Sequence, residues 1–209
     1  MSEMSAPFPG FPGVSFSITP AHQRAIRAAY ATPGRHYHTF AHAVEVVGNA
    51  AASETPWQGP GEVWLAALYH DAVYVPGGGD NEAASASLAR AHLDRWPLPV
   101  DRDRVEQLIL LTRAHGHLGP GDVDPEAARF LDADMAILAA PPAAFDAYDA
   151  AVEAEYASVI SPEAWRAGRL SFVSNLLARP RIFLSEPMHT RADALARANL
   201  RRLADRLGG

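Results

Sequence analysis

The amino-acid sequence predicts an all-α protein, a helical bundle of about seven to nine helices. Proline repeatedly follows a residue of the N-cap type, which is typical of helix starts. Ala-rich stretches such as AFDAYDAAVEAEYASVI carry apolar residues at helical spacing, with charges between them. Alternating apolar runs bounded by Asn-Gly or Asp-Gly turns, which would indicate strands, are not found.

The helix starts are the clearest local signals. Thr19-Pro20, Asp124-Pro125 and Ser161-Pro162 combine a cap residue with proline at the first helical position, and Asp80 and Asp101 are further cap candidates. The expected helices cover residues 20–31, 36–53, 61–75, 80–95, 101–115, 125–139, 142–160, 162–178 and 188–207.

The length of 209 residues suits one domain with a substantial core. Residues 1–18 are rich in Pro, Gly and Phe, and we expect an irregular N-terminal arm held by Phe8, Phe11 and Phe16. Residues 19–209 are predicted to form a single helical domain.

Composition excludes several classes of function. The formal net charge of −6 argues against a binder of nucleic-acid polymers, which needs a basic surface. The absence of cysteine excludes disulfides, thiolate nucleophiles and cysteine-bound zinc, so His, Asp and Glu must hold any metal. Such ligands suit one or two divalent ions of Mn, Mg, Fe, Ni, Co or Zn. No signal peptide and no membrane span is recognisable, so we expect a cytoplasmic protein without membrane contact.

The most informative feature is His70-Asp71 within the apolar run VWLAALYHDAVY. Burying an imidazole and a carboxylate there costs several kcal/mol unless both are neutralised and hydrogen-bonded. A divalent metal ion does both. Adjacent residues of a helix point about 100° apart, so one ion would have to lie in a groove between helices.

Upstream, RHYHTFAHAVEVV places His38 and His42 four residues apart, on one face of the expected helix. The spacing serves two metal ligands, or one ligand and a proton-transfer residue; the alternative is a surface pair. His36 is expected to be a solvated residue at the helix start.

Downstream, RFLDADMAIL sets Asp132 and Asp134 among core-type residues, and either can be a metal ligand. The alternative for one of them is an outward, solvated acid. LILLTRAHGH adds His115 and His117 as further candidates for the site. The alternative is that they stabilise the C-terminus of a helix, where a positive or polar side chain is favourable.

Other candidates lie near the expected site or could bind an anion. Glu82 follows the glycine-rich segment PGGGD and can orient a water molecule, or it can stabilise a helix start. Arg169 and Arg181 can bind an anionic substrate, or they can form ordinary salt bridges. His22 and His92 are expected at the surface.

The order His…His-Asp…Asp on a helical, cysteine-free chain resembles the HD superfamily of metal-dependent phosphohydrolases. That resemblance implies that His42, His70, Asp71 and a downstream aspartate bind a metal. Within the superfamily, the chain looks most like a bacterial group of predicted HD phosphohydrolases. The segments that carry this likeness, between residues 35 and 200, are RHYHTFAH, YHDAVY, DNEAASA, FLDADMAIL and AEY…AGR…RPRIF…ARANL.

A more distant likeness concerns mechanism. YHTFAHAVEVV is similar to the YHNxxHAxDV motif of cyclic-nucleotide phosphodiesterases, which implies His38 as proton donor and His42 as ligand. ADMAIL resembles their ADLS segment and favours Asp134 over Asp132, and TRAH places His115 near a second metal or the phosphate. Thr39 replaces the usual Asn and no purine-binding glutamine context is found, so a cyclic-nucleotide substrate is not inferred.

The sequence therefore predicts a metal-dependent hydrolase acting on a small phosphorylated molecule: a phosphomonoester, a nucleotide or a cyclic phosphodiester. Asp71 would bridge two metals if a second ion binds. Two alternatives remain open. One is a di-iron oxygenase built on the same ligands, and the other is a non-catalytic module that binds a metal or a nucleotide.

Overall fold

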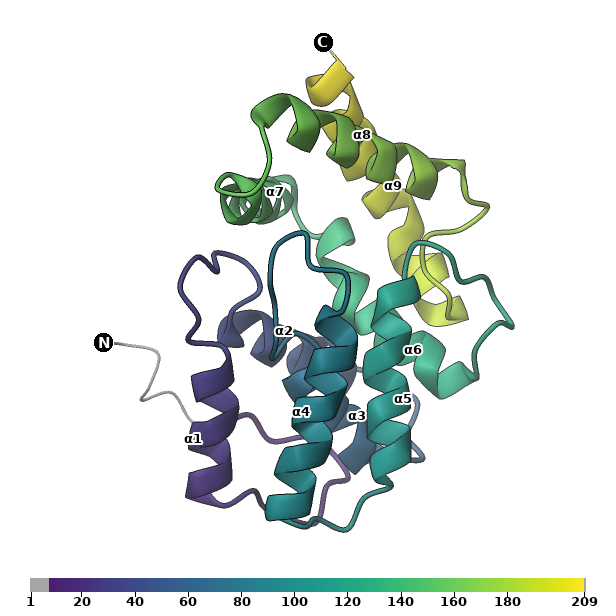
Figure 1. Cartoon of the computed structure of the whole chain (residues 1–209). Coiled ribbons are helices and arrows are strands. Elements are labelled where there is room, and N and C mark those ends of the chain that lie inside the picture. The colour runs from purple at the N-terminus through teal and green to yellow at the C-terminus, as the bar shows by residue number, and fades with distance from the viewer. Residues whose placement is uncertain (1–7, 209) are drawn as a thin grey trace. The chain divides into compact units, whose positions relative to one another are not determined.

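The computed structural model describes residues 8–208, and every regular element among them is a helix (Figure 1). The predicted all-α fold is thereby confirmed. The chain divides into two compact units, of which the first ends at Arg113 and the second begins at Ala114. The single domain expected over residues 19–209 stays a prediction, and residues 1–7 of the expected arm lie outside the described residues.

The first unit is built around one apolar helix. Within the described residues it contains α1 (Pro20–Ala29), α2 (Phe40–Ala51), α3 (Pro60–Tyr69), α4 (Asn81–Arg95) and α5 (Arg102–Leu111). Helix α3 packs against α2, α4 and α5, and all of its residues from Val63 to Tyr69 are buried. A helix that is apolar on every side belongs at the centre of a fold. The residues at the end of α3, Tyr69 and His70, therefore lie in the interior of the unit.

The described part of the N-terminal arm has no regular structure, as predicted. Its aromatic residues nevertheless attach it to the first unit. Phe11 is buried, and the rings of Phe8 and Phe16 lie 6.2 Å and 5.9 Å from the ring of Trp64. The Trp64 indole also donates a hydrogen bond of 3.0 Å to the carbonyl of Pro9.

The second unit has its own core. Its described helices are α6 (Pro125–Asp134), the 3-10 helix η3 (Met135–Ala139), α7 (Pro142–Tyr156), α8 (Pro162–Ala178) and α9 (Glu186–Gly208). Helix α9 packs against α8 and η3, and α7 packs against η3. The buried apolar side chains of this core are Leu138, Phe145, Val173, Leu176, Ile182, Phe183, Ala192, Ala196, Leu200 and Leu203.

Two buried carboxylates hold the segment between α8 and α9. Asp193 accepts the first two backbone N–H groups of residues 182–185, at 2.5 and 3.2 Å. Asp132 accepts the next two, both at 2.7 Å. The N–H groups of four consecutive residues are thus bound by side chains, although the segment pairs with no strand.

The capping prediction is confirmed at most of its positions. The cap side chains that accept a hydrogen bond from a backbone N–H of their helix are those of Thr19, Asp101, Asp124 and Ser161. Asp80 makes no such bond, although α4 begins directly after it. Its carboxylate instead lies 3.8 Å from the guanidinium of Arg113.

Helix boundaries differ from the prediction where the chain approaches the expected metal site. Helix α2 begins at Phe40 rather than residue 36, and α3 ends at Tyr69 rather than residue 75. The segments expected as 101–115 and 125–139 both continue past their α-helix as 3-10 helix; the first of these is η2 (Thr112–Ala114). None of the described helices combines the length and the apolar character needed to cross a membrane.

The prediction that His22 lies at the surface is wrong. On α1, positions 22 and 26 face inward, so His22 is fully buried beside Ile26. Its Nε2 lies 2.7 Å from the hydroxyl of Tyr69, which lies 2.9 Å from Nδ1 of the half-buried His92. The His22 ring also stacks on Trp96 at 4.8 Å. One phenol thus joins two imidazoles inside the first unit.

Candidate metal centre

Three predicted ligands meet in the first unit: His42 on α2, and His70 and Asp71 just after α3. The two Nε2 atoms of His42 and His70 are 3.1 Å apart. Oδ2 of Asp71 lies 3.4 Å from the first and 3.0 Å from the second. The structure therefore brings together two imidazoles and a carboxylate that can hold a metal ion.

These distances fit a bound first-row metal ion. Metal–ligand bonds of about 2.1 Å place neighbouring ligand atoms roughly 3.0 Å apart in octahedral and roughly 3.4 Å apart in tetrahedral coordination. The separations between the three donor atoms, from 3.0 to 3.4 Å, span this range. One point can therefore lie within bonding distance of all three atoms without movement of the backbone.

The protonation of His70 also suits a ligand. Its Nδ1 lies 3.0 Å from the carbonyl oxygen of Ala67, one turn earlier in α3. A carbonyl only accepts hydrogen bonds, so a neutral His70 carries its proton on Nδ1 and directs the lone pair of Nε2 toward the cluster. Metal-binding histidines are oriented in the same way by a partner on the other ring nitrogen.

Asp71 supplies the negative charge and the access to solvent. Burial raises the pKa of its carboxyl, but without a bound metal the charge of a protonated His70 and hydrogen bonds from His42 and His70 outweigh that effect. The pKa consequently lies well below its ordinary value, and the ligand is ionised. The Asp71 side chain is 18% exposed, against 4% for His42 and 1% for His70. Solvent thus approaches the centre from the carboxylate side.

The histidine–aspartate pair does not lie inside a helix, contrary to the prediction. His70 is the C-cap of α3, and Asp71 follows in a turn. Beyond the helix, side chains from distant parts of the sequence bind the backbone: Arg35 binds the carbonyls of Asp71 and Ala72, and Ser85 binds both the N–H and the carbonyl of Val73. In this arrangement, Nε2 of His70 and Oδ2 of the adjacent Asp71 lie 3.0 Å apart.

His38 likewise lies before α2 and not one turn below His42 on the same helix. Its carbonyl accepts a hydrogen bond of 2.7 Å from Arg35. Its ring stacks on that of Tyr74 at 4.1 Å and lies 5.9 Å from the ring of His42. His38 is thus close to the cluster but held by different neighbours.

The glycine-rich segment PGGGD is held at its ends by a contact between Val75 and Asn81, the first residue of α4. The Asn81 amide accepts from the N–H of Val75 at 2.9 Å and donates to its carbonyl at 3.0 Å. Gly77 has a φ of 74°, a left-handed conformation that glycine adopts without strain. Glu82, the predicted water-orienting residue, lies 3.5 Å from the guanidinium of Arg113. Its role in orienting water stays a prediction.

The remaining predicted ligands belong to the second unit. Nε2 of His115 lies 3.4 Å from Oδ2 of Asp134, the last residue of α6. Asp132 is buried and uses both oxygens to bind the backbone before α9. The structure thus gives Asp132 a structural role, and the metal-binding roles of Asp132 and Asp134 stay predictions. His117 is exposed.

The two arginines proposed for the substrate make contacts within the second unit. The guanidinium of Arg169 is buried and donates to Asp149 at 2.8 Å. That of Arg181 donates to the carbonyl of Phe183 at 2.8 Å and to Glu186 at 2.7 Å. Both therefore stabilise the fold, and their predicted contact with a substrate stays untested.

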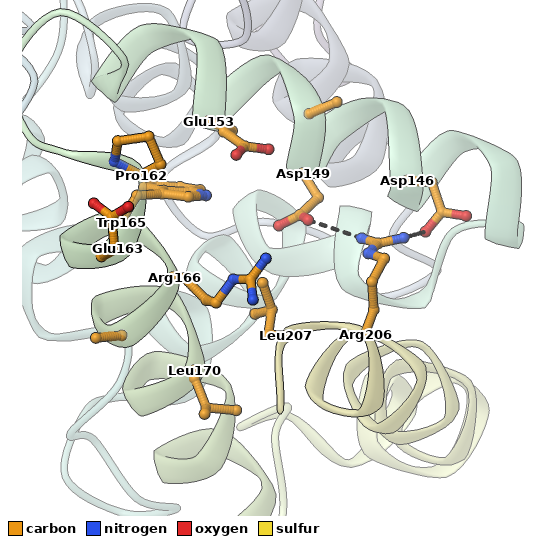
Figure 2. Close-up of a pocket in the computed structure, with 12 residues that line it drawn as sticks. Asp146, Asp149, Glu153, Pro162, Glu163, Trp165, Arg166, Leu170, Arg206 and Leu207 are labelled. Carbon is orange, nitrogen blue, oxygen red and sulfur yellow. Dashed lines mark hydrogen bonds and ion pairs between the residues drawn. The ribbon is translucent and has the colours of Figure 1, made fainter. Parts of the chain in front are cut away.

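A separate pocket of about 700 Å³ lies in the second unit, between α7, α8 and the end of α9. In Figure 2, Arg206 reaches Asp146 and Asp149 across it, at 3.2 and 2.9 Å. None of the predicted site residues lines this pocket. It therefore does not enter the assignment of the metal centre.

Sequence reasoning missed Arg35, Tyr74 and Ser85, which surround the cluster. Arg35 stands at the start of the segment RHYHTFAH, so its position beside the histidines was the available signal. Its hydrogen bonds to a turn 36 and 37 residues away could not be read from that signal.

Comparison of the chain with models of protein families, with curated proteins and with solved structures finds no match. The likeness to the HD superfamily accordingly remains an expectation drawn from the sequence motifs, and the geometry of His42, His70 and Asp71 is the independent observation beside it.

Proposed function

We propose that this protein is a metal-dependent hydrolase of a small phosphoester, with the metal held by His42, His70 and Asp71. The observation that carries the proposal is the convergence of their three donor atoms at bonding geometry. The nitrogen and oxygen donor set suits the divalent ions Mn, Fe, Co, Ni and Zn, and Mg less well.

The charge of the centre favours an anionic substrate. One carboxylate and two neutral imidazoles leave a divalent ion with a net positive charge. A bound ion of this kind polarises phosphoryl oxygens and lowers the pKa of water. Because the chain as a whole has a formal net charge of −6, such a centre would provide local attraction for a phosphate group.

His38 is the proposed proton donor to the leaving oxygen. Its ring lies beside the cluster but outside the group of three donor atoms, a position that suits a proton donor. Stacking on Tyr74 fixes the ring plane, and the bond from Arg35 fixes the backbone. Loss of the His38 imidazole should therefore lower kcat and leave metal affinity intact.

The decisive experiment measures metal affinity and hydrolysis on the same samples. Metal-free protein is titrated with Mn²⁺ by calorimetry, and then loaded protein is assayed on phosphomonoesters, nucleotides and cyclic phosphodiesters. We expect wild type to bind Mn²⁺ and hydrolyse at least one substrate class, and Asp71→Asn to do neither. Asp205→Asn, which changes an exposed carboxylate on α9, is the matched control and should retain both properties.

Each alternative has its own signature in that experiment. Hydrolysis that survives Asp71→Asn contradicts the assignment of the centre. If the same protein loaded with Fe²⁺ consumes oxygen in an added oxygen-electrode assay and hydrolyses no substrate, the oxygenase alternative is indicated. Tight metal binding without any turnover indicates a non-catalytic binding module.

A further inference from the structure

We propose that Arg35 is the positioning residue of this metal centre, holding the two ligand-bearing segments at the separation that a metal requires. The inference rests on the proposed metal site, and it assigns to Arg35 a role that neither the motifs nor the ligand geometry contains.

The guanidinium of Arg35 binds backbone from three parts of the first unit. Nη1 donates to the carbonyl of His38 at 2.7 Å and to that of Asp71 at 2.6 Å. Nη2 donates to the carbonyl of Ala72 at 2.9 Å and to that of Ala29, the last residue of α1, at 3.4 Å. One planar group thus connects the end of α1, the segment before α2 and the turn after α3.

Two of these acceptors belong to residues of the proposed site itself. The carbonyl of Asp71 moves with the carboxylate that binds the metal, and the carbonyl of His38 moves with the proposed proton donor. The bridge joins the backbone of these two residues, and the carboxylate of Asp71 lies 3.4 Å from Nε2 of His42. Arg35 therefore acts through the positions of other residues and not through contact with the metal.

The ring contacts of Arg35 strengthen the same arrangement. Its guanidinium carbon lies 5.2 Å from the ring centre of Tyr30 and 5.7 Å from that of Tyr74. The ring of Tyr74 in turn stacks on the ring of His38. Cations near aromatic faces are attracted by the ring quadrupole, so the contact adds to the hydrogen bonds.

Lysine cannot reproduce this geometry. A guanidinium offers its donors in a rigid planar fork, whereas an ammonium is a compact point charge on a flexible stem. The same bonds argue against Arg35 as a phosphate ligand, because both terminal nitrogens already donate to backbone carbonyls. Replacing an arginine that bound substrate would raise KM and leave Mn²⁺ affinity unchanged, and this difference makes the two roles separable.

The test compares Arg35→Lys and Arg35→Ala with a matched control. Arg197 also ties separate segments together, through Asp193 at 2.7 Å and the carbonyls of Leu177 and Arg179 at 3.0 and 2.7 Å. It lies in the second unit, so Arg197→Lys removes a comparable structural bridge. Mn²⁺ affinity is measured by calorimetry on metal-free protein, with thermal unfolding and circular dichroism recorded for every variant.

We expect both Arg35 variants to bind Mn²⁺ at least about tenfold more weakly than wild type, the usual effect of losing a group that orients metal ligands. Arg197→Lys should lose thermal stability and keep wild-type affinity. Millimolar guanidinium should restore affinity to Arg35→Ala and leave the other proteins unchanged, a rescue that general destabilisation does not produce. If Arg35→Ala does not fold, Arg35→Lys carries the test.

The outcomes separate this inference from the proposed function. Wild-type Mn²⁺ affinity in a folded Arg35→Lys overturns the positioning role and leaves the metal site in place. Absence of Mn²⁺ binding in wild type itself overturns the metal site, and the inference with it. An equal loss of affinity in the Arg197→Lys control would assign the effect to general destabilisation and also overturn the positioning role.

Discussion

The buried histidine of α1 makes the stability of the first unit depend on pH. His22 is fully buried and lies against Tyr69 and Trp96. Burial, together with the charge of His92, lowers the pKa of His22 from 6.5 to about 4. Replacing His22 by Gln removes the titrating group and keeps an amide that can hydrogen-bond to the Tyr69 hydroxyl.

The direction and size of the effect follow from this difference in pKa. Above pH 6.5, His22 is neutral in both the folded and the unfolded chain and makes no pH-dependent contribution. As pH falls from 6.5 toward 4, the unfolded chain binds a proton that the folded chain does not, so the free energy of unfolding decreases. The full difference corresponds to about 3 kcal/mol, of which about 2 kcal/mol is lost between about pH 7 and pH 5.

The assay is urea unfolding of wild type and His22→Gln at both pH values, with EDTA present so that metal binding does not contribute. The other titrating groups are common to both proteins, so the wild type should lose about 2 kcal/mol more than the variant on acidification. The imidazole signals of His22, identified by their absence from the variant's NMR spectrum, should not titrate above about pH 5. An equal free-energy gap between the two proteins at both pH values would refute the reasoning.

Four further predictions concern stability and metal binding. Asp132→Ala leaves two buried backbone N–H groups without their acceptor and should lower the free energy of unfolding by about 2–4 kcal/mol in urea, whereas a wild-type midpoint would contradict this role. Arg169→Met removes the buried partner of Asp149 and should cost about 3 kcal/mol in the same titration. Asn81→Ala should make the loop before α4 a site of limited proteolysis while circular dichroism stays unchanged. Mn²⁺ at about one hundred times its Kd should raise the free energy of unfolding of wild type by about 2.7 kcal/mol and leave Asp71→Asn unaffected.

Local chemistry made much of the fold predictable. Thr19, Asp124 and Ser161 are caps in the structure because the oxygen of such a side chain next to proline satisfies free N–H groups at a helix start. The apolar run before His70 similarly indicated a buried helix, and α3 is buried along most of its length. These signals lie within a few residues of the feature that they predict.

What the sequence could not provide depends on contacts between distant residues. Arg35 binds the carbonyls of His38, Asp71 and Ala72, at the two places where α2 and α3 are shorter than predicted. His22 was expected at the surface because Ala and Arg surround it, yet the inward face of α1 buries it. The same limit applies to the site: His70 and Asp71 were recognised, but their position at and after the end of α3 was not predicted.

The way that residues 182–185 are held has a consequence for the order of folding. The two carboxylates that accept their four N–H groups come from α6 and α9, on opposite sides of the segment in the sequence. The segment cannot acquire its bonds until both helices are present and packed, so it should be among the last parts of the second unit to form. Pulsed hydrogen exchange during refolding should therefore show these amides becoming protected together, after those inside α6 and α9.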